Sequence, residues 1–113
     1  MKDDLHNIPI ACSLSDAELR KREASLLAQF KSSVIATEEL PDGFAFHIPA
    51  EGKWIIAVAE LIAAERECCR FLTFELTVEP NLGPVILRIT GPPDAKAFVQ
   101  TYFTPASEMD SVP

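Results

Sequence analysis

The sequence predicts an α+β fold in which a four-stranded antiparallel sheet carries helices packed on one face. Three observations support this: stretches with apolar residues at helical spacing, stretches with apolar residues at every second position, and turn residues that separate the alternating stretches. The predicted element order is helix, hairpin, helix, hairpin, helix. Helices collected on one face of an antiparallel sheet are typical of this order.

The chain has 113 residues, a length that suits one domain with a modest core. We predict an irregular lead-in over residues 1–11, a single α+β domain over residues 12–103 and a flexible tail over residues 104–113. Pro9 disfavours helix in the residue before it, which supports the irregular start.

The first helix is marked by a capping box at its start. Ser15 and Glu18 have the spacing of that motif, and Leu14 can pack on Leu19 as a hydrophobic staple. We expect the helix to run to about Lys31. Its apolar residues recur at helical spacing at Leu19, Leu26, Leu27 and Phe30. We expect the polar residues Arg20, Lys21, Arg22 and Glu23 to face largely outward.

Alternating apolar residues predict four strands. Residues 34–40 and 44–48 flank Pro41-Asp42-Gly43, a turn in which Pro presets φ and Gly accepts a positive φ. Residues 72–78 and 85–90 flank a second turn over residues 79–84. A short last helix is predicted to end at about Phe103.

The second helix, predicted from about Lys53 to Arg70, carries a carboxylate within its apolar stripe. At 100° per residue, Glu65 falls near the centre of a stripe. The other members of the stripe are Trp54, Val58, Leu61, Ile62, Cys68, Cys69 and Leu72. A buried ionised carboxylate costs several kcal/mol or more unless it is paired. Glu65 therefore needs a hydrogen-bond donor, an arginine, a proton or a cation.

Three cysteines and this carboxylate are candidate metal ligands. Cys12, Glu65, Cys68 and Cys69 form a donor set that suits a thiophilic ion such as zinc, copper(I), mercury(II) or arsenic(III). Two adjacent cysteines do not have the spacing of a zinc ribbon. A competing interpretation is that Cys68 and Cys69 only fill the core, because free cysteine is among the most buried residue types.

A thiol enzyme or redox protein that uses Cys68 or Cys69 is a further alternative. The two residues lie at a helix C-terminus, where the macrodipole and Glu65 disfavour a bare thiolate, although Arg66 and Arg70 can offset this field. A bridge between Cys68 and Cys69 would be strained, because adjacent Cα atoms are about 3.8 Å apart, closer than in ordinary disulfides. The sequence contains no Gly-rich phosphate loop, no G-x-S-x-G elbow and no H-E-x-x-H motif.

The composition of the chain limits the kinds of partner that it can bind. A net charge of −7 argues against nucleic-acid binding. No apolar run reaches the roughly 18 residues of a membrane helix. The acidic start does not resemble an export signal, so we expect a cytoplasmic protein with free thiols. The sequence leaves open a homodimer, a protein partner, or a purely structural or interaction domain.

Three segments carry a resemblance to a protein family. They are Cys12 to Ser15, Glu65 to Leu76 and Leu87 to Pro92. Together they resemble small bacterial single-domain proteins with an E-x-x-C-C-x-F-x-x-F signature, and they are similar to the segment that follows the DNA-binding region of some MerR-like regulators. The resemblance implies that Cys12, Glu65, Cys68 and Cys69 belong to one site, as in a metal or metalloid sensor.

Overall fold

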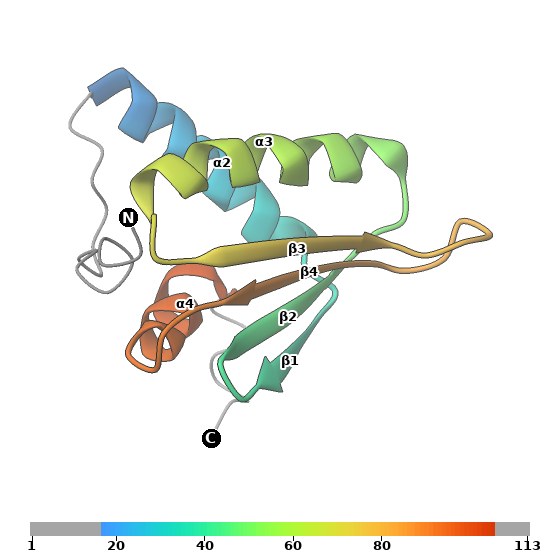
Figure 1. The fold of residues 1–113 in the computed structure, drawn as a ribbon. Helices are drawn as coiled ribbons and strands as arrows, with labels where there is room; N and C mark the ends of the chain where they lie inside the picture. Colours follow the sequence, from blue (N-terminus) through green and yellow to red (C-terminus); the bar gives the residue numbers. More distant parts are fainter. Residues whose placement is uncertain (1–16, 106–113) are drawn as a thin grey trace.

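The computed structural model describes residues 17–105, which form three helices and four strands (Figure 1). In chain order these are α2 (Ala17–Ser33), β1 (Ala36–Leu40), β2 (Gly43–Ile48), α3 (Gly52–Cys68), β3 (Thr73–Val78), β4 (Val85–Thr90) and α4 (Ala95–Phe103). Cys12, the capping residue Ser15, the predicted lead-in over residues 1–11 and the end of the predicted tail lie outside the described residues. Thr104, where that tail was predicted to begin, is buried.

The predicted order of helix, hairpin, helix, hairpin, helix is corrected by the structure. The observed order is helix, strand, strand, helix, strand, strand, helix, and the strands form one antiparallel sheet in the order β1-β2-β4-β3. β2 and β4 pair along their whole length, from Gly43 opposite Thr90 to Ile48 opposite Val85. These two strands are the most deeply buried. Their pairing at the centre merges both strand pairs into one sheet, so neither pair is a separate hairpin unit.

The core lies on one face of this sheet. Directly paired residues share a face, so Phe46, Leu87 and Leu76 form one row across the three strands. Aromatic rings from two helices meet this face. The ring of Phe30 in α2 lies 5.3 Å from that of Phe46, and the ring of Phe103 in α4 lies 6.4 Å from that of Phe74 on β3.

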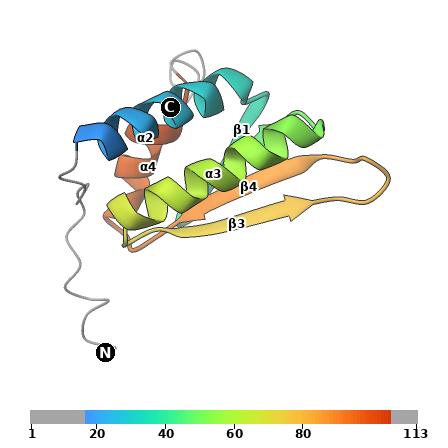
Figure 2. The same ribbon diagram turned by 90° about the horizontal axis from the view of Figure 1, so that it is seen from above.

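Helix α3 contributes the third part of the core and runs alongside α2 (Figure 2). Its buried residues are Val58, Leu61, Glu65 and Cys68, at spacings of three and four residues. This confirms the predicted stripe and the burial of Glu65 within it. The helix ends earlier than predicted. Cys69 has left the helical conformation, and its N–H donates to the Glu65 carbonyl oxygen at 2.6 Å.

Gly43 has a different role from the predicted one. None of the glycines in the described residues has a positive φ, and Gly43 is the first residue of β2. A Cβ atom at this position would collide with the carbonyl oxygen of Ile89 on β4. Gly43 therefore permits the close approach of the two central strands, and the turn itself consists of Pro41 and Asp42.

No helix within residues 17–105 is both long enough and apolar enough to cross a membrane.

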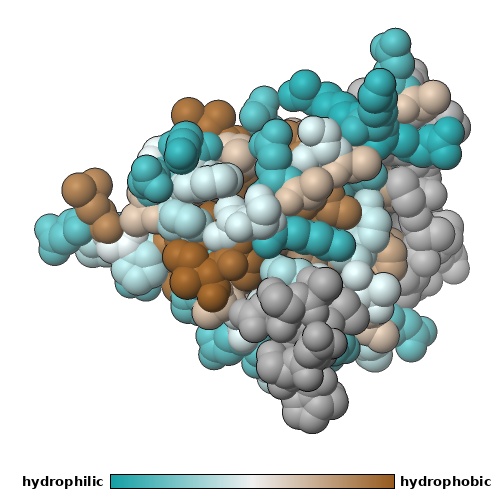
Figure 3. Space-filling view, turned by 180° about the vertical axis from the view of Figure 1, so that it is seen from behind, coloured by the Kyte–Doolittle hydropathy of each residue, from teal (hydrophilic) through white to brown (hydrophobic). Residues whose placement is uncertain are grey.

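The turn between β3 and β4 projects from the domain (Figures 1 and 3). The Gly83 N–H donates to the Pro80 carbonyl oxygen at 3.1 Å, and the two residues between them, Asn81 and Leu82, have φ values of 60° and 56°. Leu82 is 92% exposed. A left-handed conformation is unfavourable for leucine, and no burial of its side chain offsets this.

We expect Leu82→Gly to raise the free energy of unfolding, by up to about 1 kcal/mol, because glycine adopts this conformation without a Cβ clash. Leu82→Ala is the matched control. It removes the exposed side chain but keeps the Cβ atom, so it should leave stability within about 0.5 kcal/mol of the parent. Urea unfolding of the three proteins measures both effects. Equal gains from glycine and alanine would show that the strain argument is wrong.

Candidate functional site

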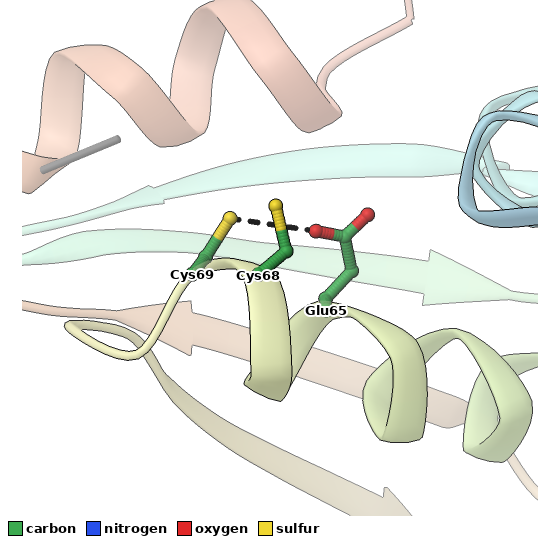
Figure 4. A group of neighbouring side chains, drawn as sticks. All are labelled: Glu65, Cys68 and Cys69. Atoms are coloured by element: carbon green, nitrogen blue, oxygen red, sulfur yellow. Dashed lines mark hydrogen bonds between the residues drawn. The ribbon is translucent and has the colours of Figure 1, made fainter. Parts of the chain in front are cut away.

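Glu65, Cys68 and Cys69 form a buried cluster at the C-terminal end of α3. Their ligand atoms, one carboxylate oxygen and two sulfurs, all lie within 4.8 Å of one another. Each of the three residues is 0% exposed. Figure 4 shows the three side chains on the same side of the helix end, where the Cys69 thiol donates a hydrogen bond to Glu65 Oε1 at 3.4 Å. The structure thus brings together three of the four predicted ligands. The fourth, Cys12, lies outside the described residues.

The two adjacent sulfurs are in different chemical states. Cys69 is a free thiol, whereas Cys68 is disulfide-bonded. The expectation that all thiols are free is therefore wrong for Cys68. The expectation that Cys68 and Cys69 do not bridge each other is confirmed, because Cys69 carries no disulfide.

Two residues of this site were missed by the sequence analysis. Glu23 of α2 was expected to face outward but is only 5% exposed. It accepts a hydrogen bond of 2.7 Å from the Tyr102 hydroxyl of α4, and its carboxyl group contacts that of Glu65. The site is therefore assembled from all three helices.

A signal for Glu23 was present in the sequence. Among the α2 residues whose burial is described, the buried ones are Glu23, Leu26, Phe30 and Ser33, at spacings of three and four residues. The same 100° count that identified Glu65 places Glu23 on this face. No comparable signal existed for Tyr102. It lies 79 residues from Glu23, and only the packing of α4 against the other helices brings the two together.

The carboxyl group of Glu65 lies in an environment that disfavours its charge. The pKa of Glu65 is raised from 4.5 to about 8, mainly by burial and in addition by the hydrogen bond and negative charge of Glu23. Glu65 Oε2 is buried and has no hydrogen-bond partner in the part of the chain that the structure describes. Within residues 17–105, neither Glu65 nor Glu23 forms an ion pair. A proton or a cation between the two carboxyl groups would offset the cost of burying their negative charge.

The two arginines near the cluster do not supply that cation. Arg66 and Arg70 are exposed and line a surface hollow of about 620 Å³ next to the helix end. Arg70 donates to the backbone oxygen of Glu67 at 3.4 Å. Their charges therefore face solvent, while the carboxyl groups lie in the interior.

The protonated forms of the neighbouring groups are favoured as well. Burial is the main cause that raises the pKa of the Cys69 thiol, and the negative charge of Glu65 adds to it. Burial, followed by the hydrogen bond to Glu23, also raises the pKa of Tyr102. A thiol in this state is a poor nucleophile. The arrangement therefore disfavours thiol catalysis by Cys69, while a cation would favour the ionised forms of the same groups.

No protein-family model, curated protein or solved structure matches the chain. The resemblance to proteins with the E-x-x-C-C-x-F-x-x-F signature therefore stays a prediction.

The raised pKa of Glu65 predicts how the stability of the metal-free protein depends on pH. Between pH 4.5 and about 8 the folded protein holds a proton on Glu65 that the unfolded chain releases. The free energy of unfolding should therefore fall as the pH rises through this window, by up to about 1.4 kcal/mol per pH unit for one proton.

Glu65→Gln removes this proton and should abolish its contribution. Urea unfolding of both proteins at several pH values between 5 and 8 gives the comparison. The stability of the parent relative to the variant should decline as the pH rises. Parallel curves would mean that Glu65 is ionised in the folded state at neutral pH.

Proposed function

We propose that this domain, in its reduced form, binds a thiophilic metal ion through Glu65, Cys68 and Cys69. The observation that carries the proposal is the convergence of their ligand atoms within 4.8 Å in the interior. A tetrahedral zinc ion with Zn–S bonds of about 2.3 Å and Zn–O bonds of about 2.1 Å holds neighbouring ligand atoms roughly 3.5 Å apart. The distance of 3.4 Å between Cys69 Sγ and Glu65 Oε1 already matches this spacing.

The charge of a metal ion also suits the surroundings of Glu65. A divalent cation would neutralise the buried carboxylate and give a ligand role to Oε2, which no group of the described residues contacts by a hydrogen bond. It would bind the thiolate forms and displace the thiol protons into solvent. The same burial that disfavours a bare thiolate excludes the water that would compete for the ion.

The disulfide at Cys68 makes binding conditional on reduction. A dithiol reductant breaks the S–S bond and supplies two electrons and two protons, and the reductant is itself oxidised to a disulfide. This releases the Cys68 thiol beside the Cys69 thiol. Metal binding at this site therefore requires a reducing environment.

A thiol-redox protein is the second candidate function. It is favoured by the presence of a disulfide-bonded cysteine directly next to a free thiol. The raised pKa of Cys69 argues against fast exchange, because the thiolate is the attacking species. For the bound ion we propose a role as sensor, carrier or resistance accessory. Of these, the sensor is the role that the resemblance to the segment following the DNA-binding region of MerR-like regulators implies.

Metal binding is tested with the reduced protein under anaerobic conditions, by competition for zinc with a chromophoric chelator. We expect one zinc ion per chain. Cys69→Ser should abolish the binding, and Glu65→Gln should weaken it by roughly tenfold to hundredfold.

Glu60→Gln serves as the control, because Glu60 lies on the same helix but is exposed and paired with Arg22 at 3.2 Å. It should bind zinc like the parent. The proposal fails if the reduced parent binds no zinc, or if Cys69→Ser binds as tightly as the parent.

A further inference from the structure

We propose that Glu23 of α2 is a further ligand of this site, and that the mixed set of sulfur and carboxylate donors selects divalent ions such as zinc, cobalt and cadmium over copper(I). This inference rests on the proposed metal binding and deepens it. It assigns a ligand from a second helix and names the class of ion.

The first support is the position of Glu23. Glu23 is only 5% exposed, and its carboxyl group contacts that of Glu65 across the interface of α2 and α3. Two buried carboxyl groups that face each other repel when both are ionised. Such an arrangement is stable when a proton or a cation lies between them.

The second support is an unpartnered atom. Glu65 is 0% exposed. Its Oε2 atom has no hydrogen-bond partner within residues 17–105, while Oε1 of the same carboxyl group accepts from Cys69. A fully buried carboxylate oxygen without a donor is unusual. A cation held between Glu65 and Glu23 would satisfy it.

The third support is the hydrogen bond that holds Glu23. The Tyr102 hydroxyl donates to Glu23 Oε2 at 2.7 Å. Metal-ligating carboxylates are commonly oriented by such a donor, and loss of the donor weakens metal binding. Tyr102 is therefore a positioning residue, which acts on the ion through Glu23.

The donor set determines the class of ion. The ligand atoms of Glu65, Cys68 and Cys69 already lie within 4.8 Å of one another. With the Glu23 carboxyl group drawn in as a fourth, two thiolates and two carboxylates would match the tetrahedral coordination of zinc. Copper(I) prefers soft sulfur ligands and gains little from carboxylates. Loss of Glu23 should therefore affect zinc and leave copper(I) binding through Cys68 and Cys69 almost unchanged.

Cobalt(II), zinc(II) and copper(I) are the probes for the test, with reduced, anaerobic full-length protein. The variants are Glu23→Gln, Glu23→Asp and Tyr102→Phe, and Glu60→Gln is the control. Circular dichroism first establishes that each variant is folded. Glu23→Gln replaces one of two facing carboxyl groups by a neutral amide of the same shape, so it should preserve the fold.

We expect Glu23→Gln to lower zinc affinity by at least roughly tenfold and to alter the visible d–d bands of bound cobalt, while the thiolate-to-cobalt charge-transfer absorption persists. Its copper(I) affinity should stay within about threefold of the parent. Glu23→Asp should retain part of the zinc affinity, because it keeps the carboxylate. Tyr102→Phe should weaken zinc binding less than Glu23→Gln does.

The outcomes separate the two proposals. If Glu23→Gln has the zinc affinity and the cobalt spectrum of the parent, Glu23 is not a ligand, but the site of Glu65, Cys68 and Cys69 stands. Equal losses of zinc and copper(I) affinity in folded Glu23→Gln would also overturn the inference, because they would indicate general damage to the site. If the parent binds neither zinc nor cobalt, the proposed function itself fails.

Discussion

The structure depends on one constraint, the burial of the Glu65 carboxyl group inside an apolar stripe. Val58 and Leu61 precede it on the same face of α3, and that face packs on the sheet and on α2. The group cannot turn to solvent unless the helix leaves its place. The surrounding protein groups have to replace the hydrogen bonds that water would donate to this carboxyl group. In the described residues they replace only part of them. Cys69 donates to one oxygen, and the other oxygen has no donor.

The neighbouring groups follow from this constraint. Glu23 and Tyr102 come from the other two helices and form a hydrogen bond of 2.7 Å beside Glu65. The result is a polar group of side chains surrounded by aromatic and aliphatic residues, with the two arginines of the helix end outside it. A polar cluster of this kind contributes little to the stability of the fold, because burying its charge is costly. A ligand role gives a physical reason for its presence.

Much of the fold could be predicted because its causes are local. Alternation at Phe44, Phe46 and Ile48 predicted a strand, and helical spacing predicted both the α3 stripe and the burial of Glu65. The strand order β1-β2-β4-β3 could not be predicted, because it depends on the contact of β2 with β4. The role of Gly43 was missed for the same reason, since its neighbour Ile89 lies on β4. Glu23 could have been found by its spacing from Leu26 and Phe30. Tyr102 could not, because its partner is distant in sequence.

The central claim is that the carboxyl and sulfur groups at the end of α3 bind one metal ion together. X-ray absorption at the zinc edge of the reduced, zinc-loaded protein tests it most directly, because it resolves the atoms bonded to the metal. The account predicts sulfur at about 2.3 Å and oxygen at about 2.0–2.2 Å from the same ion, with the oxygen contribution reduced in Glu65→Gln. A shell of sulfur alone, or of oxygen and nitrogen without sulfur, would contradict it.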